Sequence, residues 1–261
     1  MSLDKFYTST NIAKKFIDKI NDICPLDTFD RIIEPSAGCG NILNFLPKDK
    51  TIGIDIEPEG VNIIKQDYFE YESDYHPLTN NIKIAVIGNP PFGRQGSLAM
   101  KFIKHASIFS TTIAFILPRG FKKRSVYDRV PLNFWNVNEI DIPENSFTYN
   151  GEPFDAPCVW IEYKKKNKLR IKENKLTPTT FEFATKENAN VSIRRVGVNA
   201  GLTFPHTPHT DVSKPSHYFI KVDNVDEFVN KVNKIKFSDG DTTGPRSISK
   251  NELIKRIENN K

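Results

Sequence analysis

Cysteine is scarce in this chain of 261 residues. Cys24, Cys39 and Cys158 are widely separated, so neither a disulfide framework nor a cysteine zinc site is indicated. The histidines of PHTPHT, His206 and His209, have no cysteine or acid nearby to complete a metal-ligand set. The sequence therefore predicts a protein of a reducing compartment that holds no metal.

Long apolar runs are also lacking. No stretch approaches the roughly 20 apolar residues that a membrane span requires, and the opening MSLDKFYTST lacks the apolar segment of a signal peptide. We therefore expect an intracellular, cytoplasmic protein without a membrane partner, of cellular, viral or phage origin. The length suits one sizeable domain and a smaller appendage.

Positive charge is unevenly distributed along the chain. Residues 1–163 hold 17 Lys and Arg against 21 Asp and Glu, whereas residues 164–261 hold 20 against 11. The boundary falls at KKKNKLRIKENK, which is too polar for a core and indicates a linker or an exposed edge. The excess of positive charge in the second part suggests contact with a polyanion or a solvated surface.

Apolar runs rich in β-branched residues alternate with helical patterns in the first part. Runs of this kind indicate strands buried on both faces, and their alternation with helices indicates a doubly wound, mostly parallel α/β sheet. Ligands of such sheets bind beyond the carboxyl ends of the strands. After the linker, VSIRRVG, SHYFIKV and VDEFVNKVNKI predict a smaller α+β unit. The expected strands are 30–34, 51–56, 62–66, 82–88, 112–117 and 157–163.

The segment RIIEPSAGCGNIL places glycines between the first expected strand and a helix that we expect to follow it. Glycines at such a turn let the backbone approach a ligand closely. Glu34 and Asp55 close the first two strands, and Asp67 follows the third. Three acids would repel a phosphate-bearing cofactor, so they favour S-adenosylmethionine, which carries a sulfonium and an ammonium, over NAD or ATP.

The segment AVIGNPPFG ends a buried strand with an asparagine, two prolines and an aromatic residue. Methylation of an exocyclic amine needs two acceptors for its N–H groups, and the Asn89 side chain and the Pro90 carbonyl supply such a pair. Pro90 and Pro91 restrict the backbone and so preorganise these acceptors. Phe92 offers a stacking face for a base flipped out of its helix.

These motifs together resemble the N6-adenine DNA methyltransferases of the gamma arrangement, over about residues 5–163. The order KFYTSTNIA, EPSAGCG, GIDIEP, QDYF and NPPF matches that family, and Ser9 is a departure because many relatives carry proline there. The resemblance implies a Rossmann-like class I methyltransferase that binds S-adenosylmethionine and DNA. It assigns Asn89, Pro90, Pro91 and Phe92 to catalysis, and it assigns cofactor binding to Tyr7, Thr8, Glu34, Pro35, Ser36, Gly38, Gly40, Asp55, Ile56, Asp67, Tyr68 and Asn89.

Two later segments resemble substrate-binding parts of the same family. TIAFILPRGFKKRS resembles the fifth strand and its loop, with a positive patch of Arg119, Lys122, Lys123 and Arg124. This patch would contact phosphate or, as the alternative, form a solvated loop. IPENSFTYNGEPFDAPCVWIEYK resembles a late hairpin whose aromatic residue sandwiches the flipped base. Phe147 is the first choice for that role and Phe154 the second, and the alternative for either ring is a place in the core. Residues 164–261 would form the target-recognition region.

Other substrates fit the same motif. NPP followed by an aromatic residue also serves enzymes that methylate a protein glutamine, a guanine amine in ribosomal RNA or an adenine beside an mRNA cap. A catalytically silent nucleic-acid-binding subunit is a further alternative. A cytosine C5 methyltransferase is excluded, because it needs a cysteine nucleophile and residues 85–95 contain none. Adenine in DNA is the first choice of substrate and adenine in RNA the second. The recognition sequence, the strandedness of the target and the oligomeric state do not follow from the sequence.

Overall fold

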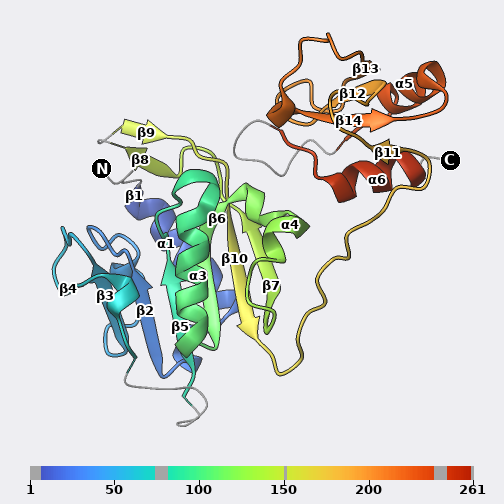
Figure 1. The fold of residues 1–261 in the computed structure, drawn as a ribbon. Helices are drawn as coiled ribbons and strands as arrows, with labels where there is room; N and C mark the ends of the chain where they lie inside the picture. Colours follow the sequence, from blue (N-terminus) through green and yellow to red (C-terminus); the bar gives the residue numbers. More distant parts are fainter. Residues whose placement is uncertain (1–6, 74–81, 150–151, 238–245, 260–261) are drawn as a thin grey trace. The chain divides into compact units, whose positions relative to one another are not determined.

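The chain forms two compact units, Met1–Lys172 and Glu173–Lys261, drawn in Figure 1 and treated separately below. The computed structural model describes residues 7–73, 82–149, 152–237 and 246–259. The first unit extends past the boundary expected after Tyr163, because Arg170 is part of its interior. The Arg170 guanidinium is buried and donates to the carbonyls of Phe134 (2.7 Å) and Val130 (2.9 Å).

The described part of unit 1 contains a seven-stranded sheet of order β4-β3-β2-β5-β6-β10-β7. Strands β2 to β6 run parallel to their neighbours, whereas β10 is antiparallel to both β6 and β7. The predicted Rossmann-like, mostly parallel sheet is confirmed. The strands are β2 (Arg31–Pro35), β3 (Thr51–Asp55), β4 (Ile63–Lys65), β5 (Ile84–Gly88), β6 (Thr112–Pro118), β7 (Phe134–Asp141) and β10 (Cys158–Lys165).

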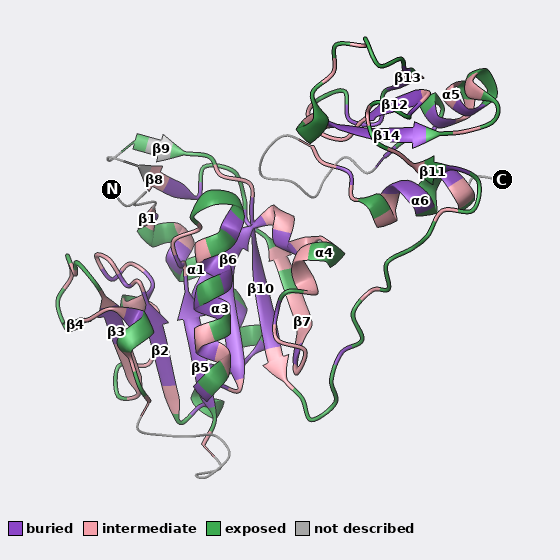
Figure 2. Ribbon diagram, in the orientation of Figure 1, coloured by how far each residue is buried: buried purple, intermediate pink, exposed green. Residues whose placement is uncertain are grey.

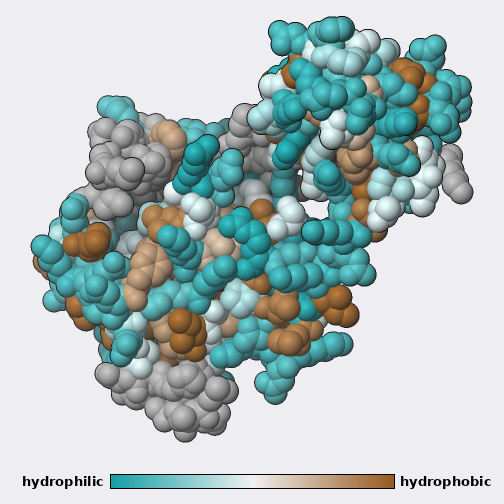
Figure 3. Space-filling view, viewed as in Figure 1, coloured by the Kyte–Doolittle hydropathy of each residue, from teal (hydrophilic) through white to brown (hydrophobic). Residues whose placement is uncertain are grey.

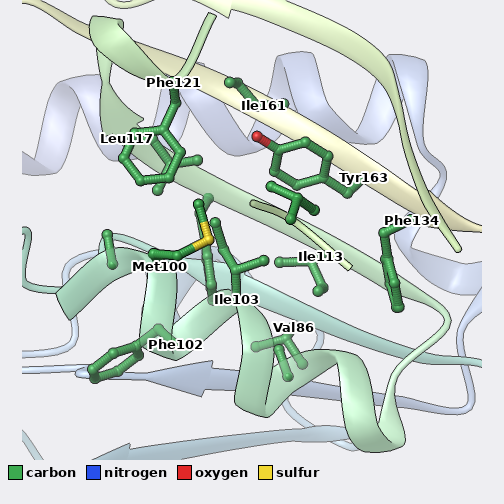
Figure 4. Close-up of a cluster of buried hydrophobic side chains, with 14 of the residues drawn as sticks. Val86, Met100, Phe102, Ile103, Ile113, Leu117, Phe121, Phe134, Ile161 and Tyr163 are labelled. Carbon is green, nitrogen blue, oxygen red and sulfur yellow. The ribbon is translucent and has the colours of Figure 1, made fainter. Parts of the chain in front are cut away.

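Two hydrophobic clusters cover the two faces of this sheet. Successive residues of a strand point to opposite faces, so Val86 of β5 and Ile113 of β6 meet one cluster while Ala85 meets the other. Figure 4 shows Met100 and Ile103 of helix α3 (Ser97–Phe109) in the first cluster. Helix α1 (Thr10–Ile23) packs in the second cluster through Ala13, Phe16, Ile17 and Ile20.

The structure differs from the expected elements at two places. The glycine segment does not lead into a helix but into a single 3₁₀ turn, η2 (Leu43–Phe45), because few residues remain before β3 and Pro47 lies among them. Strand β7 was not expected, because polar residues make up half of its sequence, FWNVNEID. The expected runs 30–34, 51–56, 62–66, 82–88, 112–117 and 157–163 correspond to β2, β3, β4, β5, β6 and β10.

A small sheet of order β1-β8-β9 joins the amino-terminal segment to the late hairpin. Thr8 pairs with Phe147 in an antiparallel ladder. The strands are β1 (Tyr7–Thr8), β8 (Phe147–Tyr149) and β9 (Glu152–Phe154). The remaining short helical segments of unit 1 are η1 (Leu26–Thr28), η3 (Tyr68–Glu70), η4 (Arg94–Gly96), η5 (Arg119–Lys122) and α4 (Arg124–Tyr127).

Unit 2 is the predicted α+β unit, with an antiparallel sheet of order β11-β14-β12-β13. Its core includes Val191 and Ile193 of the sheet and Leu253 and Ile257 of the last helix. The predicted cap of that helix is present, because the Ser249 hydroxyl accepts the Glu252 N–H at 3.1 Å. The elements are β11 (Glu182–Phe183), β12 (Val191–Arg194), β13 (Thr203–Pro205), η6 (Lys214–Ser216), β14 (His217–Lys221), α5 (Val225–Asn233) and α6 (Lys250–Asn259).

Burial follows this architecture closely. Figure 2 shows β5, β6 and β10 almost wholly buried, while the segment that follows β10 is mostly exposed. The face in view in Figure 3 is largely hydrophilic with scattered hydrophobic residues. Among the described residues, no helix has the length and apolar character needed to cross a membrane.

Candidate functional site

A pocket opens at the carboxyl edge of the parallel strands in unit 1. Residues from the ends of β2, β3 and β5 meet there with residues of β1, as expected for a ligand site in this fold. The predicted residues that line the pocket are Tyr7, Thr8, Glu34, Ser36, Gly38, Asp55, Ile56, Asp67, Tyr68, Asn89, Pro90, Pro91 and Phe92.

The glycine segment forms a tight loop at the base of this pocket. Ser36, Gly38 and Gly40 all have positive φ angles of 60°, 54° and 84°. A Cβ atom at Gly38 would lie only 3.0 Å from the ring of Tyr7, so the missing side chain allows the β1 segment to approach the loop. The Tyr7 hydroxyl donates to Glu59 Oε1 at 2.8 Å. Gly40 shapes the loop but does not line the pocket, and neither does Pro35, the last residue of β2.

Asp55 holds the loop from the end of β3. Its Oδ2 atom accepts the Gly38 N–H at 2.7 Å, and its Oδ1 atom accepts the Glu57 N–H at 2.8 Å. Both oxygens are therefore already committed to backbone groups, although each retains a further lone pair for a ligand hydroxyl. This loop-shaping role of Asp55 was not apparent from the sequence.

Glu34 is the buried acid of the pocket, with 2% of its surface exposed. Burial, and secondarily the negative charge of Asp55, raise its pKa well above the ordinary value, while a backbone hydrogen bond at Leu43 opposes the shift. Its Oε2 atom has no hydrogen-bond partner among the described residues. A Cβ atom at Gly88 would lie 3.3 Å from Glu34 Cγ, so glycine leaves the space that this side chain occupies. An unsatisfied buried carboxyl group indicates a missing cationic or donating partner.

Asp67 and aromatic residues form another wall of the pocket. Asp67 caps the turn η3 by accepting the Phe69 N–H at 2.9 Å. The Tyr68 ring is buried and stacks on Phe102 of α3, with centroids 5.0 Å apart. Phe69 is 39% exposed and lines the same pocket, as does the half-exposed Ile56. Exposed apolar groups on a concave wall offer faces to a flat ring.

The NPPF segment connects β5 to helix α3. The carbonyl of Phe92 accepts the N–H groups of Leu98 (3.0 Å) and Ala99 (3.3 Å), so the first turn of α3 fixes the end of the segment. Pro90 is buried and Phe92 half-buried. Gly93 follows with a φ of 64°. The tetrapeptide therefore lies between the end of β5 and the first turn of α3.

Strand β1 reaches Asn89 directly. The Asn89 Nδ2 atom donates to the Thr8 hydroxyl at 3.4 Å, and Thr8 is 4% exposed. The Asn89 Oδ1 atom is buried, and the residue lines the pocket. The Ser9 N–H donates to the carbonyl of Ser146 at 3.1 Å, a bond that proline at this position could not make. Ser9 therefore contributes a backbone contact between the segments that carry β1 and β8.

The predicted substrate-binding residues outside NPPF do not line the pocket. Lys122 lies 3.1 Å from Asp141 and 3.6 Å from Glu139, and Arg119 lies 3.6 Å from Asp141. These carboxylates neutralise much of the positive patch to which Lys123 also belongs. The role of this positive patch in phosphate contact stays a prediction.

The structure corrects the expectation for Phe147. Its ring is 1% exposed and belongs to the core cluster of α1, because β8 pairs with β1 and turns this side chain inward. It is a packing residue rather than a stacking surface. Phe154, on the neighbouring strand β9, is 36% exposed. The second choice is thus the more accessible ring of the two.

Several pocket residues had no sequence signal that set them apart. Phe69 follows the predicted pair Asp67 and Tyr68 directly, so the aromatic content of DYFEY is the one available hint. The others come from segments that fold against the motifs. The additional lining residues are Ala37, Cys39, Asn41, Ile42, Glu57, Gln66, Phe69, Leu98 and Phe102.

His206 and His209 lie in unit 2, and the partners of His206 are protein groups. His206 is buried, with Nδ1 2.9 Å from the Ser192 hydroxyl and Nε2 2.8 Å from the Lys186 carbonyl. His209 is exposed. Within the described ranges, no group of three His, Cys, Asp or Glu side chains is arranged to hold a metal ion.

No family model matches the sequence, and no curated protein matches it. Solved structures of similar fold include a candidate RNA methyltransferase from Pyrococcus horikoshii, with 19% identity and a TM-score of 0.44 over 62% of this chain and 87% of that one. The 23S rRNA methyltransferase ErmE has 15% identity and a TM-score of 0.43 over 61% and 71%. Magnesium protoporphyrin IX methyltransferase from Synechocystis, with bound SAM, has 12% identity and a TM-score of 0.43 over 60% and 79%. At such values the likeness concerns the fold alone.

Proposed function

We propose that the chain is an S-adenosylmethionine-dependent methyltransferase that acts on the exocyclic N6 amine of adenine in DNA. The observation that carries the proposal is the gathering of Glu34, Asp55 and Asp67 with Asn89 around one pocket. The pocket thus combines acids that suit a cationic, phosphate-free cofactor with acceptors that suit an amine. A cofactor and a substrate amine bound there would lie side by side.

The pocket residues fit the cofactor on chemical grounds. The unsatisfied carboxyl group of Glu34 would accept from the ammonium of the methionine part. The remaining lone pairs of Asp55 suit ribose hydroxyls, while Asp67, Ile56 and Phe69 suit an adenine ring and its amine. When bound, S-adenosylmethionine supplies an electrophilic methyl group on a sulfonium.

NPPF would orient the substrate amine. The Asn89 side-chain oxygen and the Pro90 carbonyl each accept one N–H, which turns the nitrogen lone pair toward the electrophile. Because the segment is fixed by α3 and by the prolines, these acceptors need little reorganisation as positive charge develops on nitrogen. Phe92 would stack on the flipped base, and the exposed ring of Phe154 is the remaining choice for its other face.

The preference for DNA over other substrates rests on the motif order and on the presence of a second folded unit after the methyltransferase fold. A protein glutamine enzyme would not obviously need that unit, and such enzymes usually carry tyrosine at the position of Phe92. RNA adenine remains the nearest alternative, since its amine poses the same chemical problem.

The experiment that tests the proposal is a transfer assay with methyl-labelled S-adenosylmethionine. Purified protein is incubated with matched double-stranded DNA, single-stranded DNA, RNA and release-factor protein, and the labelled nucleoside or residue is identified by mass spectrometry. We expect N6-methyladenine in DNA. Label in RNA would change the substrate but keep the chemistry, whereas label in protein alone, or no transfer with bound cofactor, would refute the proposal.

A further inference from the structure

Three segments far apart in the sequence meet at Thr8. Asn41 of the glycine loop donates from Nδ2 to the Thr8 carbonyl at 2.8 Å, and Asn89 of NPPF donates from Nδ2 to the Thr8 hydroxyl. On the other side, Thr8 pairs with Phe147 of β8. The backbone of Thr8 is therefore held from two directions, and its hydroxyl has a fixed place beside Asn89.

We propose that Thr8 is a positioning residue that orients the Asn89 carboxamide for amine methylation. This inference rests on the proposed function. A carboxamide can present either its oxygen or its nitrogen, and only the oxygen can accept an N–H from the substrate. By accepting from Nδ2, the Thr8 hydroxyl selects the rotamer in which the nitrogen faces β1 and the oxygen lies at the opposite end.

The role differs from the cofactor contact that the sequence resemblance assigns to Thr8. A cofactor contact would affect the binding of S-adenosylmethionine, whereas an orienting contact acts on the chemical step. The site chemistry favours the second role, because the hydroxyl is 3.4 Å from Asn89 Nδ2 and Thr8 is almost entirely enclosed. Such contacts are often long in a ligand-free site and shorten in the reacting complex.

The test compares Thr8→Val, which keeps the shape but removes the hydroxyl, with Thr8→Ser, which keeps the hydroxyl. We expect Thr8→Val to lower the single-turnover methylation rate by about tenfold, with little change in the dissociation constant of S-adenosylmethionine. Thr8→Ser should restore most of the rate. Thr112→Val is the matched control, because Thr112 at the start of β6 is as buried as Thr8 and lies outside the pocket.

A double-mutant cycle identifies the partner. In an Asn89→Ala background, Thr8→Val should have no further effect on the rate, because the group that it orients is gone. A similar loss in both backgrounds would overturn the inference, as would weaker cofactor binding with an unchanged rate. If Thr8→Val does not fold, Thr8→Ala takes its place in the cycle.

A spectroscopic readout separates this inference from the proposed function. The side-chain amide resonances of Asn89 should shift in Thr8→Val but not in Thr112→Val, whether or not the protein methylates the tested substrates. If wild-type protein transfers no methyl group, the proposed function fails while the contact is still measured. Unchanged Asn89 resonances in Thr8→Val would overturn the positioning role itself.

Discussion

Two buried polar side chains, one in each unit, differ in how fully they are paired within the protein. In unit 2, His206 is buried and uses both ring nitrogens within the protein, with Ser192 and the carbonyl of Lys186. In unit 1, Glu34 is equally buried, yet its Oε2 atom has no partner among the described residues. A satisfied polar group stabilises a fold, whereas an unsatisfied one in a pocket indicates a ligand. The comparison therefore indicates a ligand beside Glu34 in unit 1 and a structural role for His206 in unit 2.

The charges of the two units are more alike than the sequence boundary implies. Residues 1–172 hold 23 Lys and Arg against 21 Asp and Glu, and residues 173–261 hold 14 against 11. The difference lies in residues 164–172, which contain six Lys and Arg and no acid but belong to unit 1. Positive charge is thus concentrated in one segment of unit 1 rather than spread over unit 2.

The largest effect should follow from Asn89→Ala. Removal of a preorganised acceptor should lower the single-turnover rate of methyl transfer by on the order of 100-fold or more, because the acceptor matters most as charge develops. Binding of S-adenosylmethionine, measured by calorimetry, should change little. Asn188→Ala, an exposed change in unit 2, is the control. A wild-type rate for Asn89→Ala would mean that NPPF is only a turn.

His206→Ala should show the opposite behaviour in unit 2. It leaves Ser192 and the Lys186 carbonyl without their partner and creates a cavity, so unit 2 should lose about 2 to 3 kcal/mol of stability. Hydrogen exchange of the β12 amides measures this loss, and His209→Ala is the exposed control. Cofactor affinity should stay the same. A large fall in that affinity would show that unit 2 supports the pocket.

Glu34→Gln should weaken cofactor binding while making the cofactor-free protein more tolerant of high pH. Loss of the charge that pairs with the ammonium should raise the dissociation constant of S-adenosylmethionine by about 10- to 100-fold. Isothermal titration calorimetry measures this change. Unaltered affinity would contradict the assignment of Glu34 to the cofactor.

The pH dependence of unit 1 follows from the raised pKa of Glu34. The unfolded chain ionises at the ordinary carboxyl pKa, whereas the folded, cofactor-free protein retains the proton to higher pH. The free energy of unfolding should therefore fall as pH rises from the ordinary value through the folded pKa. Denaturant melts between about pH 5 and pH 8 should show this slope in wild type and a smaller one in Glu34→Gln.

The smallest effect concerns the segment 164–172. Its lysines 165, 166, 168 and 172 have no ion pair with a described residue, whereas Arg119 and Lys122 are paired. We expect glutamine at these four positions to weaken nucleic-acid binding. The salt dependence of binding should also fall, by about one unit of slope for each phosphate group that the variant no longer neutralises. Fluorescence anisotropy over a range of salt concentrations measures both.

The matched control for that variant removes the same charge from unit 2. Glutamine at the exposed lysines 175, 221, 234 and 236 should have the smaller effect. If instead this control binds more weakly than the first variant, unit 2 carries the polyanion contact that the sequence assigns to residues 164–261. Equal weakening would indicate attraction by net charge without a defined surface.

The sequence was most informative where local pattern and burial agree. Strands such as β5 could be predicted because an apolar run of that length has few alternatives in a soluble fold. The prediction of a helix after the glycine loop was wrong, because Pro47 and the short connection to β3 prevent a helix there. Phe147 was misassigned because pairing with β1, more than a hundred positions earlier in the chain, decides its burial.

Side-chain contacts between segments far apart in the chain could not be predicted from the sequence. Nothing local to Thr8 or Asn89 shows that the two meet, since 81 positions separate them. The buried guanidinium of Arg170 was missed for a similar reason, because it stands in a run of lysines that indicates a solvated linker. The polar composition of residues 164–175 predicts that their side chains are exposed. Arg170 is buried nevertheless, because backbone carbonyls accept hydrogen bonds from its guanidinium.

The pairing of β1 with β8 has a consequence for how the protein is made. Tyr7 and Thr148 lie 141 positions apart, so a ribosome must synthesise most of unit 1 before β1 has its neighbour. Contacts of such long sequence separation form late and slow the folding of a domain. A nascent chain that ends before β8 would lack Phe147, the residue with which Thr8 of β1 pairs. The pocket should therefore be completed only in the last stage of the domain's synthesis.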